Sequence, residues 1–142
     1  NLEESGYRNA ENKSSWFVME TNQKIYLVEY KNANISGAKK PEAFIPTNDK
    51  TINKVVRKFY DSLHYLSLQG KTKPKEYVYI LEYPNGDSAS RKMIRNRLKS
   101  KLPFALQENI GNGIKLIEKV EVLSIAEWND HKYYGEFPIQ HI

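Results

Sequence analysis

The sequence contains no cysteine, and no unbroken run of aliphatic or aromatic residues approaches the length of a membrane span. The absence of cysteine excludes disulfides, thiolate zinc sites and cysteine nucleophiles, so any metal would need oxygen or imidazole ligands. A membrane-spanning helix takes about 20 consecutive apolar residues, so the sequence predicts a soluble protein, which we expect to be cytoplasmic. Walker A and dinucleotide-binding glycine motifs are also missing, which leaves nucleotide hydrolysis and dinucleotide redox chemistry without support.

The length and composition are those of one folded domain. The chain has 142 residues, and a domain commonly contains about 100 to 200. Hydrophobic residues make up 39% of it and tyrosine occurs ten times, which is too apolar and too aromatic for a disordered chain. The chain does not begin with methionine, and residues 1–6 resemble neither a signal peptide nor a transit sequence. We expect residues 1–142 to form one domain that is part of, or excised from, a longer protein; the alternative is a natural chain that lost its first residues.

The hydrophobic pattern predicts six elements in the order strand, strand, helix, strand, helix, strand. The predicted strands cover residues 16–20, 24–30, 75–83 and 115–125, and the predicted helices cover residues 49–69 and 88–102. Residues 32–48 are predicted to form a surface loop, and the aromatic tail 128–142 is expected to add an edge strand. Strands that are joined through a helix lie parallel, so we predict an α/β (α+β) fold with a mixed central sheet flanked by helices.

The first two predicted strands form a hairpin that carries a charged pair. A turn centred on Asn22 would pair residues whose numbers sum to 44, with Ser15 opposite Glu29. This register predicts one apolar face, made of Phe17, Met19, Ile25 and Leu27. Side chains alternate between the two faces of a strand, so Glu29 and Lys31 are expected on the same face, at the end of the second strand.

The hairpin, the Glu29-x-Lys31 element at its end, the helix that follows and the next strand resemble the PD-(D/E)xK nuclease superfamily over about residues 14–83. The resemblance implies a restriction-endonuclease-like core and hydrolysis of DNA. It also implies that Glu29 holds Mg²⁺ or Mn²⁺ and that Lys31 activates or positions the attacking water. Mg²⁺ prefers several oxygen ligands in octahedral geometry, which explains why two converging carboxylates are needed beside a cation.

The sequence departs from the family pattern at the first metal ligand. The position expected to hold an aspartate reads Ser14-Ser15, and a serine hydroxyl brings no charge to a metal. Glu11 is the nearest carboxylate that would replace it, so the expected metal ligands are Glu29 and Glu11. Glu20 is disfavoured because the predicted register points it to the opposite face. The alternatives are a catalytically degenerate relative that binds nucleic acid or protein, and a plain ion pair at a strand end.

The second predicted helix contains an uncompensated basic segment at residues 91–101. Its six cations are Arg91, Lys92, Arg95, Arg97, Lys99 and Lys101. The apolar residues Ile94, Leu98 and Leu102 are spaced to face the core, so the cations are predicted to bind the phosphates of nucleic acid. A solvated helix face and a contact with an acidic protein are the alternatives.

Together these features predict a nucleic-acid-acting domain of a bacterial or phage defence or repair protein. DNA is the expected partner, although the residues do not distinguish DNA from RNA. Further domains of a longer chain, or a second copy in a homodimer, are other expected partners. Asp61 and His64 share a predicted helix face and offer a weaker metal site, since Asp61 can equally pair with Arg57 or Lys58.

Overall fold

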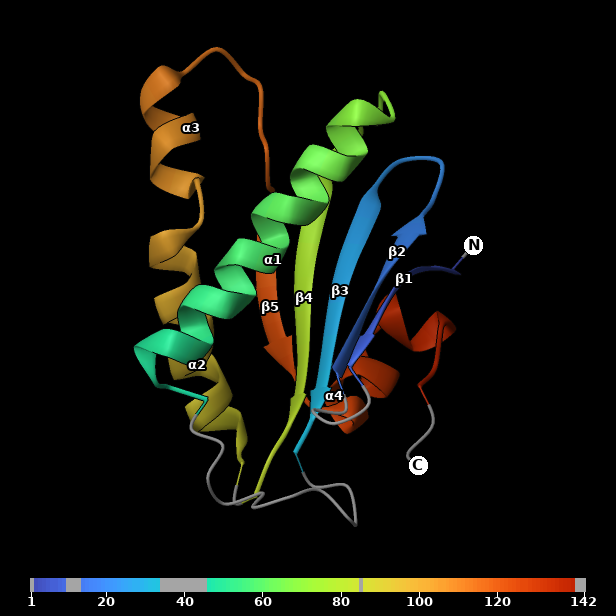
Figure 1. Ribbon diagram of the computed structural model, residues 1–142, viewed down its shortest axis with the longest axis vertical. Coiled ribbons are helices and arrows are strands. Elements are labelled where there is room, and N and C mark those ends of the chain that lie inside the picture. The colour runs from blue at the N-terminus through green and yellow to red at the C-terminus, as the bar shows by residue number, and fades with distance from the viewer. Residues whose placement is uncertain (1, 10–13, 34–45, 85, 140–142) are drawn as a thin grey trace.

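The computed structural model describes residues 2–9, 14–33, 46–84 and 86–139, which form a five-stranded sheet with helices on both faces (Figure 1). The strands are β1 (Leu2–Asn9), β2 (Ser14–Glu20), β3 (Ile25–Asn32), β4 (Lys75–Glu82) and β5 (Lys119–Leu123). The helices are α1 (Asp49–Leu68), α2 (Ser88–Lys101), α3 (Phe104–Ile110) and α4 (Ile125–Asp130), followed by the 3₁₀ turn η2 (Tyr134–Glu136). The predicted fold class, a mixed sheet flanked by helices, is confirmed.

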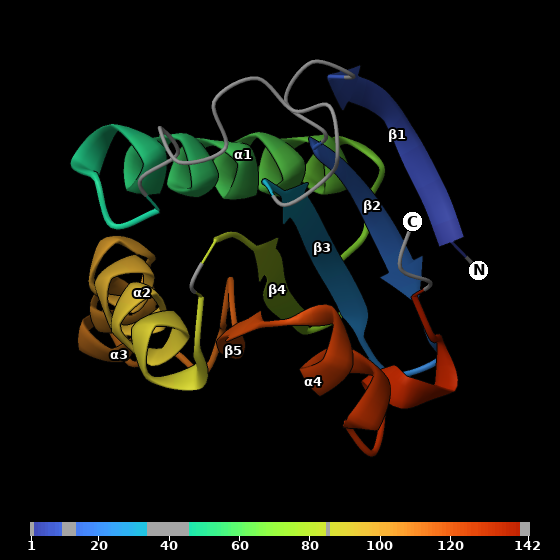
Figure 2. The same cartoon turned by 90° about the horizontal axis from the view of Figure 1, so that it is seen from below.

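The strands follow one another across the sheet in chain order, from β1 to β5. The pairs β1–β2 and β2–β3 are antiparallel, whereas β3–β4 and β4–β5 are parallel. Parallel neighbours need a crossover connection, and α1 and α2 provide the two crossovers. Both crossovers advance in the same direction across the sheet, so α1 and α2 cover the same face, and α4 covers the other (Figure 2).

Helix α1 forms where the three- and four-residue spacing of apolar residues predicted it. Five apolar residues of the predicted stripe are buried against the sheet: Ile52, Val55, Phe59, Leu63 and Leu66. The Asn48 side chain caps the first turn by accepting a hydrogen bond from the Lys50 backbone amide at 2.8 Å. Gly70, at φ +71°, follows the last turn in the left-handed conformation that glycine adopts without strain.

Helix α2 also follows its predicted boundaries. Asp87 and Ser90 form a reciprocal capping box at its start, and Ile94, Leu98 and Leu102 are buried as predicted. Helix α3, which follows Pro103, was not anticipated from the sequence. Much of the predicted loop at 32–48 lies outside the described residues, which leave out 34–45.

The last part of the chain differs from the prediction. The strand predicted at 115–125 is confined to β5. The edge strand predicted within 128–142 does not form in its described part, 128–139, which contains the end of α4 and the 3₁₀ turn η2. A reciprocal capping box between Ser124 and Glu127 starts α4, and it places Ile125 and Trp128 on one buried face. The edge strands of the sheet are β1, which pairs with β2, and β5, which pairs with β4.

The predicted hairpin register is wrong by one residue. The pairs sum to 45, so Ser15 lies opposite Tyr30 and Trp16 lies opposite Glu29. The turn has four residues instead of three, because the Thr21 amide donates to the Lys24 carbonyl at 2.8 Å. A shift of one residue moves every side chain of one strand to the other face.

The two faces of the hairpin therefore differ from the predicted ones. Ile25 and Leu27 pack under α1, as part of the larger apolar cluster. Met19 and Phe17 lie on the α4 face, where they join the smaller cluster around Trp128. The single apolar face predicted from these four hairpin residues is thus divided between the two sides of the sheet.

Candidate functional site

Glu29 and Lys31 lie near the end of β3, on the face that α1 covers. The prediction that they share a face is confirmed, since both interact with lysines of α1. Strands β3 and β4 are parallel, so their carboxyl ends meet at this edge of the sheet. Ligands of α/β proteins commonly bind outside the carboxyl ends of parallel strands, which makes this edge a candidate site.

The Glu29 carboxylate is buried, with 2% of the residue exposed. Its Oε1 atom accepts a hydrogen bond from Lys58 Nζ at 2.8 Å, whereas Oε2 has no hydrogen-bond partner among the described residues. Burial raises the pKa of Glu29 to about 7, although Lys58 and then Lys31 act in the opposite direction. A buried carboxylate oxygen without a donor is costly, and a bound cation or proton would relieve this cost.

Lys31 lies in a locally positive environment. Burial lowers its pKa, and the nearby charges of Lys58 and Lys54 lower it further, while Glu29 opposes them. Lys58 and Lys31 therefore lie near the Glu29 carboxylate, and Lys54 adds a third positive charge near Lys31. The excess positive charge favours an anionic group at this edge.

The structure places the other predicted metal ligands as follows. Glu11 lies outside the described residues. Ser15 pairs with Tyr30 and so does not share the face of Glu29, which corrects the prediction; the residue at the register position opposite Lys31 is Ser14. The prediction placed Ser15 on the wrong face because the pairing register depends on the length of the hairpin turn.

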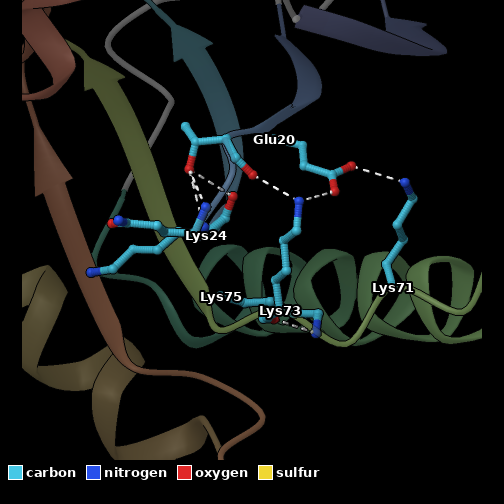
Figure 3. Close-up of polar contacts among 7 residues, drawn as sticks. Glu20, Lys24, Lys71, Lys73 and Lys75 are labelled. Atoms are coloured by element: carbon cyan, nitrogen blue, oxygen red, sulfur yellow. Dashed lines mark hydrogen bonds and ion pairs between the residues drawn. The ribbon is translucent and has the colours of Figure 1, made fainter.

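Glu20 is also placed differently from the prediction. It pairs with Ile25, so it shares the sheet face of Glu29, but it lies at the opposite end of the hairpin. There it accepts hydrogen bonds from Lys73 Nζ at 2.6 Å and Lys71 Nζ at 2.9 Å (Figure 3). These bonds, first that of Lys73, lower the pKa of Glu20 to about 2. Glu20 thus fastens the hairpin to the segment before β4 and is not a ligand for the Glu29 site.

The described residues do not by themselves fit a Mg²⁺ ion. No group of three or more histidine, aspartate or glutamate residues in the described part of the chain is arranged to hold a metal. Mg²⁺ demands near-octahedral oxygen coordination, and the Glu29 site contributes one carboxylate beside two ammonium groups. A metal site here would need a carboxylate from outside the described residues, such as Glu11.

Arg91 of the predicted basic segment is buried, with 6% of the residue exposed. Its Nε atom donates to the Leu81 carbonyl at 2.9 Å, and its guanidinium lies 3.6 Å from the Glu82 carboxylate. Arg91 therefore fastens α2 to β4 and does not face a partner. The sequence held a signal for this, because Arg91 precedes Ile94 and Leu98 at the same helical spacing.

The remaining cations of α2 lie toward the outer surface. Lys92, Lys99 and Lys101 are exposed, and Arg95 and Arg97 are partly exposed. Arg97 contacts the Asp49 carboxylate and the Thr47 carbonyl at the start of α1. Lys101 donates to Asn53 Oδ1 at 2.9 Å, a neutral partner that leaves its charge uncompensated. These contacts join the end of α2 to the beginning of α1.

Helix α1 extends the positive surface in a way that sequence reasoning missed. Together α1 and α2 contain ten basic and two acidic residues, whereas the net charge of the whole chain is +5. We call the outward cations of the two helices the basic face: Lys50, Lys54, Arg57, Lys92, Arg95, Arg97, Lys99 and Lys101. The basic residues of α1 are interspersed with its apolar residues, so they do not form a basic run in the sequence. The concentration of positive charge becomes apparent only when α1 and α2 are placed side by side.

Comparisons with known proteins give no assignment. No family model matches the sequence, and no match is found among curated proteins or solved structures. None of the described helices is long and apolar enough to cross a membrane. The function therefore has to be inferred from the charge and geometry of the residues themselves.

Proposed function

We propose that this chain is a nucleic-acid-binding domain that holds the DNA backbone on its basic face. The observation that carries the proposal is the basic face itself, eight outward cations on two helices that cover the same side of the sheet and contain only two acidic residues. Acidic residues elsewhere reduce the overall charge to +5, so the excess is concentrated on one side. A domain of this kind would meet DNA in the cytoplasm of a bacterium or in a phage-infected cell.

The physical basis of this binding is the release of counterions from DNA. Each phosphate that a lysine or arginine neutralises frees condensed cations, so affinity falls steeply as salt increases. Lys92, Arg95 and Lys99 follow one another along α2 at three- and four-residue steps. Such a row contacts phosphates and not base edges, so binding should depend little on DNA sequence.

A pair of matched variants tests the proposal. Lys92→Gln/Lys99→Gln removes two charges from the basic face, and Lys119→Gln/Lys132→Gln removes two lysine charges from outside it. Binding of a labelled DNA duplex is measured by fluorescence anisotropy between about 50 and 200 mM salt. The first variant should bind more weakly to every sequence and lower the log–log salt slope by about 2. Equal effects of the two variants, or no binding by the parent, would contradict the proposal.

Metal-dependent hydrolysis of DNA is a second candidate function. The specific observation in its favour is the unpartnered Glu29 Oε2 atom, buried on the same face as Lys31. The Glu29-x-Lys31 pair at a strand end is also the element that resembles the PD-(D/E)xK nucleases. Against it stands the finding that no three histidine, aspartate or glutamate residues in the described part of the chain are arranged to hold a metal. We therefore rank a binding domain without its own hydrolytic activity first.

The strand register supplies a matched test of the second candidate. Ser14 lies opposite Lys31 and Ser15 opposite Tyr30, so an aspartate introduced at 14, but not at 15, has the register of the Glu29 site. Mn²⁺ titration by calorimetry should detect a gain of binding in Ser14→Asp alone if the site is a degenerate metal site. If Glu11 already completes the site, the parent binds Mn²⁺ and cleaves plasmid DNA, and Glu11→Gln and Glu29→Gln abolish both. No response in the parent or in Ser14→Asp would end the nuclease interpretation.

A further inference from the structure

A cavity of about 550 Å³ lies at the other end of the sheet. It is lined by the end of β2, the hairpin turn, the first residues of β3, β4 and β5, and the segment from His131 to Phe137 that follows α4. Its volume is within the range of about 300 to 1,000 Å³ that is usual for small-molecule sites. The helix α4 lies on the face opposite to α1 and α2, so this cavity is separate from the basic face (Figure 2).

One wall of the cavity is aromatic: its lining rings belong to Tyr26, His131, Tyr133, Tyr134 and Phe137. Trp128 does not line the cavity and packs behind Tyr134. The buried Tyr134 ring lies between Trp128, at a centroid distance of 4.7 Å, and His131, at 4.0 Å, and it is nearly parallel to both. Tyr26 meets Tyr134 edge to face at 5.8 Å. The Trp128 Nε1 atom donates to the Phe137 carbonyl at 2.8 Å, which fixes the stack. Rings that are already held in place lose little entropy when a ligand binds against them.

The polar floor of the cavity is electrically balanced. The buried Glu76 carboxylate accepts hydrogen bonds from the Tyr134 hydroxyl at 2.8 Å and from Lys24 Nζ at 2.6 Å. The bond to Glu76 raises the pKa of Lys24, so this lysine stays charged. The formally charged lining residues are two lysines, Lys24 and Lys119, and two glutamates, Glu76 and Glu136. Their charges cancel, which favours an uncharged ligand over a phosphate.

The lining of the cavity also supplies hydrogen-bonding groups and one exposed ring. His131 Nδ1 accepts from the backbone amides of Tyr133 and Tyr134 at 3.1 and 3.3 Å, which leaves the other ring nitrogen, Nε2, as the donor. The Gln23 amide and the Glu136 carboxylate add a donor and acceptors to the lining. The Tyr133 side chain is also part of the lining, and the residue is 61% exposed. An exposed ring in this position offers a second stacking surface to a flat ligand.

We propose that this cavity binds an uncharged planar heteroaromatic ring with polar edges, of the kind that a nucleoside carries. The lining rings of Tyr26, Tyr133 and Phe137 contact the ring face. Gln23, His131 and Glu136 meet its polar edges. The balanced lining explains why the ligand carries no net charge. This site is independent of the DNA contact on the basic face.

The experiment is a titration followed by NMR, with adenosine, guanosine, cytidine and uridine as separate probes. Saturable shifts are expected in the amides of Gln23, Lys24 and His131 and in the indole of Trp128. Tyr133→Ala removes the exposed ring and should weaken binding by at least about fivefold. Tyr65→Ala is the control, because this tyrosine is also exposed but lies on α1.

Several results would overturn the proposal. One is the absence of a saturable shift with all four nucleosides, and another is an equal loss in the two tyrosine variants. Tighter binding of the 5′-monophosphates, with shifts in α2, would assign the effect to the basic face. N-acetyl-tryptophanamide that binds as tightly as the best nucleoside would make the cavity a site for aromatic side chains in general. Loss of DNA binding in the basic-face variants bears only on the proposed function and leaves this result unaffected.

Discussion

Replacing Glu29 by glutamine should change how the stability of the protein depends on pH. Burial raises the pKa of Glu29 from 4.5 to about 7, so between these values the folded state holds a proton that the unfolded state has lost. The free energy of unfolding therefore falls as pH rises through this window and levels off above pH 7. At about 1.4 kcal/mol per pKa unit, the loss from this one group amounts to about 3 kcal/mol.

Glutamine has nearly the same shape, keeps an oxygen that can accept from Lys58, and does not ionise. In Glu29→Gln this fall should be absent, so the variant should gain about 3 kcal/mol relative to the parent between pH 4 and pH 8. The measurement is urea denaturation of both proteins at one-unit pH intervals, in buffer with EDTA. A difference that stays constant across this range would show that the lysines offset burial at Glu29, and one that changes in the opposite direction would show that they outweigh it.

Glu20→Gln is the matched control, because the pKa of Glu20 is shifted the other way. Its bonds to Lys73 and Lys71 lower this pKa to about 2. The folded state then binds fewer protons than the unfolded state, so Glu20 stabilises the protein above pH 4.5, and this contribution is lost as pH falls toward 2. The variant should thus lose stability relative to the parent at neutral pH, and the difference should shrink in acid.

Three further predictions concern stability, each measured by urea or thermal denaturation. Arg91→Met should destabilise the fold by about 2 kcal/mol or more, because it leaves the Leu81 carbonyl without its buried donor, whereas Arg95→Met should change stability by less than about 0.5 kcal/mol. Ser124→Ala should cost about 1 kcal/mol through the lost cap of α4. Phe59→Ala should cost about 3 to 5 kcal/mol, since this ring is fully buried under α1. Equal effects at the two arginines would contradict the assignment of Arg91 as an anchor.

Elements that are defined by local periodicity could be predicted from the sequence. The apolar stripe of α1, the stripe of α2 and the parity of Glu29 and Lys31 all depend on spacing along one segment. The hairpin register could not be predicted in this way, because one hydrogen bond at Thr21 decides between a three- and a four-residue turn. The tail was assigned by its aromatic content, although the Ser124-x-x-Glu127 cap was a readable signal for a helix.

The candidate site was predicted only in part, since its chemistry depends on residues that are distant in the sequence. Lys58 reaches Glu29 across 29 positions, and no pattern in the chain links the two. The burial that raises the pKa of Glu29 likewise comes from the packing of α1 over the end of β3. Strand β1 carries no apolar alternation, and its place in the sheet follows from backbone pairing with β2.

The two proposed sites should act independently of each other, because they differ in both position and charge. Lys24 lines the cavity, and Lys31 lies within the influence of Lys54, which belongs to the basic face. The two lysines are seven residues apart, and at about 3.3 Å per residue this is a separation of about 23 Å. The Debye length is about 8 Å at physiological salt, so charges at one end influence the other only weakly. Nucleoside affinity should therefore be the same in the presence and absence of saturating DNA, as measured by the Trp128 indole shift. A change of tenfold or more, equivalent to about 1.4 kcal/mol of coupling, would show that the sheet transmits binding between its ends.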